Sequence, residues 1–235
     1  MTITNIIYTI IFICITISLL STIFTKYIVG KYSGYTSGLK ITSQEFIKMF
    51  IKDNNLKDVD CKYIEGECND YYDLSSSTVN LSDVSYNKNT VSALAIAGHE
   101  CGHILQNKKH SLFLKIRYKL FYYVIAFCYL ATVVMALSYI LDYSQITSYA
   151  AYVLAAGLIF QFLTFPIEID ASRKAMKYLK NKNLDKKELF AIGTILFSAA
   201  LSYLDIIFLN IINMFKLTWN NESRYSLLSF HNFFK

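Results

Sequence analysis

Residues 90–107 read TVSALAIAGHECGHILQN, an apolar stretch without proline that contains the spacing H-E-x-x-H. In a helix, His99 and His103 project from the same face, so both imidazoles can bind one metal ion. Glu100 is rotated by about 100°, which lets it reach a water molecule at that ion without being a ligand beside the histidines. Cys101 points away from the histidine face, and we exclude it from the metal site. The pattern predicts a Zn²⁺ site with Glu100 as a general base.

A helix with two surface histidines would also fit these residues. The chain has only four histidines among 235 residues, however, so two of them would seldom fall into this motif by chance. We therefore interpret the motif as a metal site.

The composition points to a membrane protein. Hydrophobic residues make up 54% of the chain, the mean hydropathy is +0.34, and there are one proline and eight glycines. This is too apolar for an ordinary soluble domain, and 235 residues are too few for several domains.

The first apolar segment lies at the start of the chain. Residues 1–25 carry no charge, and Ile6–Phe24 are almost continuously apolar. Because this segment has neither a basic region before it nor a small-residue cleavage site, we expect a retained anchor and not a signal peptide.

Further apolar segments follow the motif. Lys119 and Asp142 bracket 22 uncharged residues, and Asp142 and Glu168 bracket another 25, which predicts a membrane hairpin with its tip at Asp142–Gln145. Phe190–Phe215 is a fourth candidate, with Asp205 as its only charge. Any one segment could be a buried core helix. Together they leave too little soluble surface to bury them, so we expect three to four transmembrane helices.

Basic residues predict the orientation. Residues 26–119 contain 13 Lys and Arg and residues 172–187 contain seven, whereas the start of the chain and the hairpin tip contain none. By the positive-inside rule, the basic regions are cytoplasmic and the N-terminus is outside. The tail with Lys216, Arg224 and Lys235 fits less well, so the fourth segment could be tilted or re-entrant. The net charge of +6 does not indicate nucleic acid binding, because the lysines flank apolar segments.

The expected organisation has three parts. Residues 1–25 are the anchor, residues 26–118 are a cytoplasmic zincin-like region, and residues 119–235 are membrane helices. The expected fold class is a mainly α integral membrane protein with a small α+β cytoplasmic part. Within that part we expect a helix capped by Ser43, and strands near Val59–Ile64 and Thr78–Leu81. The motif helix is expected near Thr90–Asn107.

A zincin needs a third protein ligand, and Glu168 is the best candidate. It lies at the cytoplasmic end of the third apolar segment, on the membrane face where the motif helix is expected. A carboxylate at a bilayer boundary is costly unless it is partnered, and a metal ion would be such a partner. The alternative is a boundary charge that reaches the lipid headgroups.

Several motifs together resemble the YugP-like neutral zinc metallopeptidases, a family of small bacterial membrane proteins. They are Asp70-Tyr71-Tyr72-Asp73, Val79-Asn80-Leu81-Ser82, Ser92–Gly98 before the first histidine, Gln106 after the second, and Pro-x-Glu-x-Asp-Ala-Ser-Arg at 166–173. The resemblance extends from about Ser37 to Met176.

The resemblance implies a membrane-embedded, gluzincin-like peptidase with His99, His103 and Glu168 as zinc ligands and Glu100 as the base. Related membrane proteases carry Asp where this chain has Ser172, and here the acid is Asp170. Asp170 could support a ligand histidine and orient its ring without binding the metal itself. The family usually has His at the position of Tyr71.

Two smaller features leave alternatives open. Thr78–Leu81 could be an edge strand that binds substrate backbone, or an internal strand. Cys61 and Cys68 share a loop and could pair, but five cysteines without a secreted context favour reduced thiols.

These features predict a multi-pass protein of a bacterial plasma membrane with its active site facing the cytoplasm. We expect a zinc metalloendopeptidase that hydrolyses membrane or membrane-proximal proteins. Its expected partners are the lipid bilayer and a protein or peptide substrate, with no nucleic acid. The main alternative is a catalytically silent, metal-binding scaffold or chaperone-like protein, which would have no need of Glu100. A transporter would need several polar groups inside its membrane helices, and Asp205 alone is little support for one.

Overall fold

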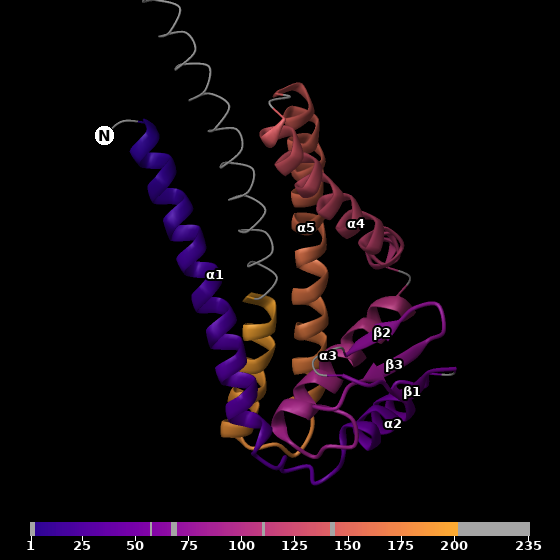
Figure 1. Ribbon diagram of the computed structural model, residues 1–235. Coiled ribbons are helices and arrows are strands. Elements are labelled where there is room, and N and C mark those ends of the chain that lie inside the picture. The colour runs from indigo at the N-terminus through magenta and orange to yellow at the C-terminus, as the bar shows by residue number, and fades with distance from the viewer. Residues whose placement is uncertain (1–2, 57, 67–69, 110, 142–143, 202–235) are drawn as a thin grey trace, which may run out of the picture. The chain divides into compact units, whose positions relative to one another are not determined.

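The computed structural model describes residues 3–56, 58–66, 70–109, 111–141 and 144–201. Its elements are α1 Ile3–Ser33, α2 Ser43–Asp53, β1 Asp60–Tyr63, β2 Tyr71–Asp73, β3 Thr78–Leu81, α3 Val91–Lys108, α4 Leu112–Ile140 and α5 Ser144–Leu179 (Figure 1). Residues 186–201 are also helical. The described chain is mostly helical with one small sheet, which confirms the expected mainly α class.

The described residues form two compact units. Residues 21–118 and 164–201, here called the site unit, form one. Residues 3–20 and 119–163, here called the hairpin unit, form the other. The expected metal ligands and Glu100 all belong to the site unit.

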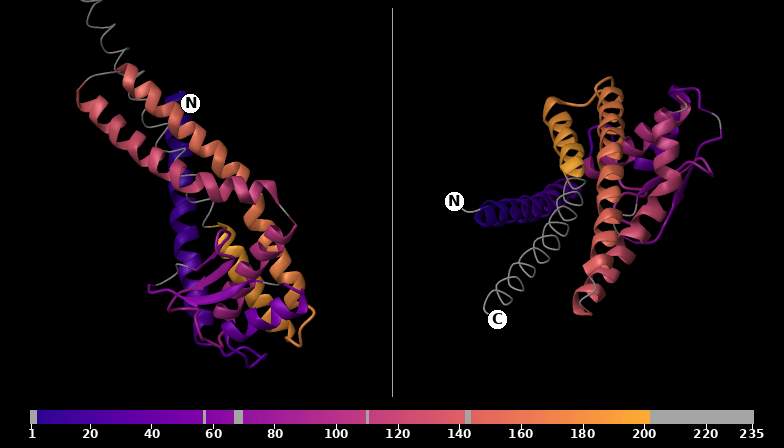
Figure 2. Two further views of the ribbon diagram at one scale, coloured as in Figure 1. Left: turned by 90° about the vertical axis from the view of Figure 1, so that its right-hand side faces the viewer. Right: turned by 90° about the horizontal axis from the view of Figure 1, so that it is seen from above.

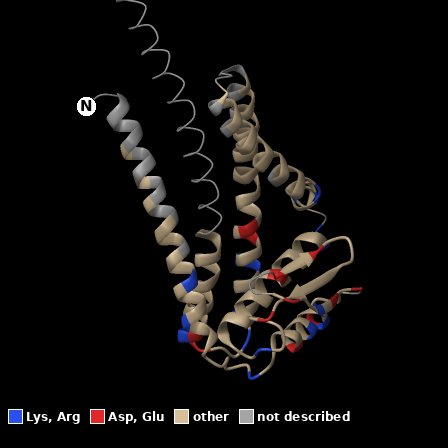
Figure 3. Ribbon diagram, in the orientation of Figure 1, with Lys and Arg blue, Asp and Glu red and all other residues tan. Residues whose placement is uncertain are grey.

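In the hairpin unit, α4 and α5 run side by side (Figures 1 and 2). Their contact is tight, because a Cβ at Gly157 would lie 2.4 Å from the Cys128 sulfur. Leu112–Val134 and Tyr152–Leu179 are long and apolar enough to cross a bilayer, and these stretches overlap the two segments of the predicted hairpin. Figure 3 shows how few charges the described hairpin carries.

The other two predicted segments are described to different extents. The first lies within α1, which continues past the expected anchor to Ser33. Of the fourth, Phe190–Phe215, residues 190–201 are helical and the rest, including Asp205, lies outside the described residues. Cys68 also lies outside them, whereas Cys61 is a free thiol.

The N-terminus of α2 shows a correction of one residue. Thr42, and not Ser43, caps the helix: its hydroxyl accepts from the Glu45 N–H at 3.2 Å, and Glu45 Oε2 accepts from the Thr42 N–H at 2.8 Å. This reciprocal pair satisfies two backbone donors at the helix start. Ser43 instead is buried and donates to the Ser85 carbonyl at 2.5 Å.

The sheet has the order β1-β3-β2, with β1 parallel and β2 antiparallel to β3. All four residues of β3 are buried between its two neighbours. The expectation that Thr78–Leu81 could be a free edge is therefore wrong, because hydrogen-bonding positions on both sides of the strand are occupied. The edges are β1 and β2. β2 was not predicted, since three residues within a polar segment give no readable periodicity.

The core of the site unit lies where α2 and α3 pack together with the end of α5. Phe46, Ile47 and Phe50 of α2 are at most 1% exposed. The Tyr178 ring of α5 lies edge-on to the Phe50 ring, with 4.7 Å between centroids. This packing holds the motif helix against α5.

Candidate active site

The motif helix α3 is buried along most of its length. Thr90 caps it by accepting from the Ala93 N–H at 3.3 Å, and the helix runs to Lys108, one residue beyond the expected end. Cys101 faces the core with no exposed surface, and burial raises the pKa of its thiol well above the usual value. Small residues before the motif let neighbouring elements approach the helix closely.

The closest approach is at Gly102, inside the motif. A Cβ there would lie 2.3 Å from the Ala171 carbonyl oxygen and 2.9 Å from its Cα, so no other residue fits without a backbone shift. One turn earlier, a Cβ at Gly98 would lie 3.6 Å from Ala175 Cβ. The backbones of α3 and α5 therefore nearly touch. This brings Glu168, three residues before Ala171, to the histidine face.

His99, His103 and Glu168 meet there. The Nε2 atoms of the two histidines lie 3.0 and 3.7 Å from the same atom, Glu168 Oε2. One potential ligand atom from each residue lies within 4.8 Å of the others. Glu168 is only 1% exposed, and the His103 side chain 9%. The structure thus brings together all three residues expected as ligands.

The spacing suits one tetrahedral ion. Ligand atoms about 2.0–2.1 Å from zinc lie about 3.3 Å from one another, and the two Nε2–Oε2 distances fall on either side of this value. Two imidazoles and one carboxylate are a donor set that zinc accepts, and three protein ligands leave one position open. The residues therefore fit a catalytic zinc ion.

The orientation of His103 is determined through Gln106. The Gln106 Nε2 group donates to the Ile167 carbonyl at 2.7 Å and to Asp170 Oδ2 at 2.8 Å. Both contacts are acceptors, so the amide nitrogen must face them and Oε1 must face His103. At 2.9 Å, Oε1 can only accept, so His103 Nδ1 carries the proton and Nε2 keeps its lone pair.

Asp170 thus acts on a histidine indirectly. Its carboxylate contacts Gln106 and forms an ion pair with Lys174, but it contacts neither His99 nor His103. The sequence left open how Asp170 could orient a ligand histidine, and in the structure the connection runs through Gln106. Gln106 entered the sequence analysis only as part of the family motif. Its position three residues after His103, on the same helix face, was the available signal.

His99 has a simpler partner. Its Nδ1 lies 3.1 Å from Ser172 Oγ, at the position where related proteases carry Asp. A hydroxyl can either donate or accept, so Ser172 positions the ring but does not determine its tautomer.

Arg117 is a site residue that the sequence analysis missed. Its Nη1 forms an ion pair with Glu168 Oε1, and its side chain is 16% exposed. Glu168 is therefore held from two sides, by the histidines at Oε2 and by Arg117 at Oε1. A single arginine among many basic residues gave no signal for this contact.

Glu100 is buried beside the donor cluster, at 6% exposed. Burial raises its pKa to about 7; Glu168 and Asp70 act in the same direction, and His99 opposes them. Glu100 is not among the grouped ligand atoms. A carboxylate with a pKa near neutrality can take up and release a proton.

The arrangement combines two helix-borne histidines, a glutamate between them in sequence and a carboxylate from a second helix, a group that could hold a metal ion as in zinc metallopeptidases. The chain belongs to the family described as "Putative neutral zinc metallopeptidase", which it matches over residues 7–221. It is 28% identical over 174 residues to "Putative membrane protease YugP" of Bacillus subtilis, a match that covers 74% of this chain and 77% of the relative. No solved structure matches the chain.

Proposed function

We propose that this protein is a membrane-embedded zinc endopeptidase that hydrolyses peptide bonds of membrane or membrane-proximal proteins at the cytoplasmic face. The observation that carries the proposal is the convergence of His99, His103 and Glu168 on one point, with Glu100 buried beside them.

In this proposal, the two histidines and Glu168 hold the zinc ion. When bound, zinc supplies a Lewis acid that polarises a peptide carbonyl and makes water at the site more acidic. Glu100 accepts the proton of the attacking water and returns it to the leaving amine. Gln106 would hold the His103 ring with Nε2 available to the ion, and Arg117 would hold the second carboxylate oxygen of Glu168.

The substrate would bind along β2. This strand is an edge of the sheet and lies next to α3, and its middle residue, Tyr72, donates its backbone N–H to Glu100. An extended peptide could add to its free side through main-chain groups other than the Tyr72 N–H, which Glu100 occupies. Tyr71, half-exposed on this strand, would then be next to the substrate.

Three observations support the membrane placement. The relative from Bacillus subtilis is named a membrane protease, α4 and α5 contain stretches long enough to span a bilayer, and the basic residues are asymmetric. In this scheme residues 26–118 face the cytoplasm, residues 1–25 are an anchor and residues 119–235 include the other membrane helices.

Cysteine labelling tests the orientation. Lys109→Cys and Ser144→Cys are compared with the parent chain in intact cells, using a reagent that does not cross membranes. We expect labelling at position 144 and protection at position 109. Labelling at 109 but not at 144 would reverse the topology.

The activity is tested with Glu100→Gln in the full-length chain. The variant should bind zinc at the parental stoichiometry but cleave a detergent-solubilised single-span protein with an extended juxtamembrane segment about 10²–10⁴-fold more slowly. Glu65→Gln, an exposed glutamate elsewhere, is the control. If Glu100→Gln cleaves as fast as the parent, the base assignment is lost. If neither protein cleaves although zinc is bound, the silent metal-binding scaffold becomes the better description.

A further inference from the structure

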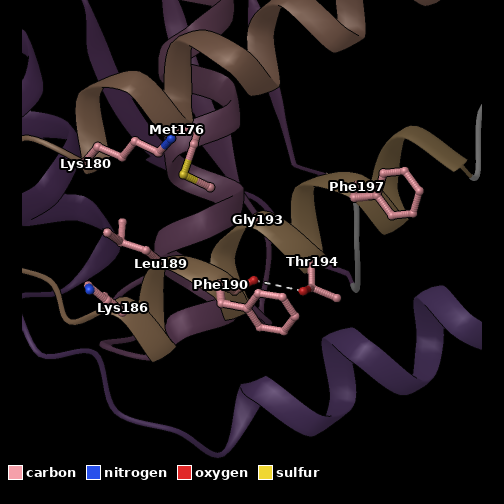
Figure 4. A pocket seen from close by; sticks show the side chains of 8 residues that line it. All are labelled: Met176, Lys180, Lys186, Leu189, Phe190, Gly193, Thr194 and Phe197. Atoms are coloured by element: carbon pink, nitrogen blue, oxygen red, sulfur yellow. Dashed lines mark hydrogen bonds between the residues drawn. The ribbon is translucent and has the colours of Figure 1, made fainter.

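A second feature of the site unit lies away from the zinc ligands. A groove opens between the end of α5 and the helical segment 186–201, and Figure 4 shows its lining side chains. It encloses about 530 Å³. The lining residues are Met176, Lys180, Lys186, Leu189, Phe190, Gly193, Thr194 and Phe197.

The wall from segment 186–201 is apolar. Phe190 and Phe197 are 73% and 59% exposed and, at seven residues apart, lie on the same helix face. Gly193 lies between them, and a Cβ there would lie 3.2 Å from Met176 Cε of the opposite wall. The two large rings are therefore available to a ligand while the groove between them remains narrow, which suits a hydrocarbon chain.

The wall from α5 is basic. Arg173 and Lys177 of α5 and Lys180, the residue after its end, are all exposed and follow the i, i+4, i+7 spacing of one helix face. Together with Met176 and Asn181 they line a second hollow of about 340 Å³, which shares Met176 and Lys180 with the groove. Lys186 adds a cation from the other side.

These cations differ from their neighbours in lacking acidic partners. Lys174 forms an ion pair with Asp170, and Lys182 forms one with Asp53 at 2.6 Å. Within residues 3–201 as described, Arg173, Lys177, Lys180 and Lys186 form no ion pair. None of the described acids lines either hollow.

Two acids at the start of segment 186–201, Asp185 and Glu188, already accept hydrogen bonds. Glu188 accepts from the Ser37 hydroxyl at 2.6 Å and from the Gly38 N–H at 3.0 Å. Asp185 accepts from the backbone N–H of Glu188 at 2.6 Å. Neither of these acids forms an ion pair with the four cations in the described chain, so a ligand from outside can bind them.

We propose that this groove binds an anionic phospholipid, with the headgroup phosphate at Lys180 and Lys186 and an acyl chain along Phe190 and Phe197. The proposal rests on the membrane placement above, since the apolar stretch Tyr152–Leu179 of α5 ends at the groove. Basic pockets beside membrane helices on the cytoplasmic side are suited to anionic headgroups. A free phosphate ion would leave the phenylalanines unused, and a zwitterionic lipid would leave the four cations uncompensated.

Lipid retention by the full-length chain tests the headgroup part. The delipidated protein in neutral detergent is titrated with dioleoyl phosphatidylglycerol or dioleoyl phosphatidylcholine, and bound lipids are counted by native mass spectrometry. We expect tighter binding of phosphatidylglycerol. Lys180→Gln with Lys186→Gln should lower the affinity for phosphatidylglycerol on the order of tenfold or more, because each basic residue near an anionic lipid contributes to the binding free energy. Lys48→Gln with Lys52→Gln, an exposed pair on α2, should leave it unchanged.

The acyl part is tested separately. Phe190→Ser with Phe197→Ser should weaken binding of the diacyl lipid, and millimolar inorganic phosphate should compete only weakly with it. The proposal is overturned if both lipids bind equally, if the α2 control pair loses as much affinity, or if phosphate alone displaces the lipid. If the protein is instead a dimer whose mass does not change when lipid is added, the groove is assigned to a second copy of the chain.

This measurement does not depend on catalysis. The titration is made with zinc-free and zinc-loaded protein, and no cleavage is measured. Selective lipid binding by a protein without peptidase activity would therefore contradict the proposed function and leave the lipid site standing.

Discussion

Helices α3 and α5 supply the candidate zinc ligands, and the two helices differ in their surroundings. α3 is buried within the site unit, and its two histidines follow from helical spacing alone. α5 is a 36-residue helix, apolar for most of its length, whose only acids are Glu168 and Asp170. On α3 the sequence pattern predicts the geometry directly. On α5, whether Glu168 can be a ligand depends on how closely the two helices approach.

The comparison also separates the two histidines. His103 is held by a relay through Gln106 to α5, in which every donor and acceptor is assigned by its partners. His99 has one adaptable hydroxyl, Ser172, behind it. We therefore expect changes around His103 to affect the metal more than changes around His99.

The largest expected effect is that of removing the ligand from α5. Glu168→Ala should weaken zinc binding by more than the 10–100-fold typical of losing a supporting group, because two imidazoles under-coordinate the ion and Arg117 loses its partner. Zinc content and affinity of the purified protein are the measurements. Asp170→Ala is the comparison and should lose less. If Asp170→Ala lost zinc while Glu168→Ala kept it, the two roles would have to be exchanged.

The close contact between the helices can be broken without touching a ligand. Gly102→Ala should destabilise the site unit by about 1–3 kcal/mol and lower zinc affinity, because the new Cβ meets the Ala171 backbone. Unfolding in denaturant and zinc titration measure the two effects.

Gly30→Ala is the matched control within α1. Nothing lies within 4 Å of a Cβ at Gly30, and alanine is favoured over glycine in a helix by about 1 kcal/mol. This variant should be as stable as the parent or more so. Equal behaviour of the two variants would show that the helix contact does not position Glu168.

The relay behind His103 gives a smaller effect. Gln106→Leu should weaken zinc binding by about 10–100-fold, and His103 should no longer be held in one tautomer. The ¹⁵N chemical shifts of the imidazole in the zinc-free protein report the tautomer. Gln44→Leu, on α2, removes a glutamine hydrogen bond to Tyr86 at 3.2 Å and should leave both readouts unchanged. A parental zinc affinity and tautomer in Gln106→Leu would rule out the relay.

The smallest expected effect concerns only α3. Thr90→Ala removes the cap of the motif helix and should cost about 1 kcal/mol of stability, with the zinc affinity of the folded protein unchanged. Denaturant unfolding and zinc titration of the same preparation decide this. A large loss of zinc would mean that the helix start is coupled to the site, contrary to the local role assigned here.

Much of the helical framework was predictable because it depends on local patterns. The motif helix was expected at Thr90–Asn107 and observed at Val91–Lys108, and the two apolar segments of the hairpin correspond to α4 and α5. The sheet was less predictable. β2 is too short for its alternation to be read, and the central position of β3 depends on pairing with strands from both sides.

The sequence by itself determined the candidate ligands and the candidate base. The i, i+4 spacing puts His99 and His103 on one face of any helix that forms there, and few acids other than Glu168 lie near an apolar boundary. Only the tertiary structure decided how these residues are held. The Gly102–Ala171 contact, the Arg117 ion pair and the Gln106–Asp170 relay join residues 51 to 69 positions apart, and no local pattern encodes such distances. Side chains so far apart meet only after packing of the core has placed α3 and α5 together.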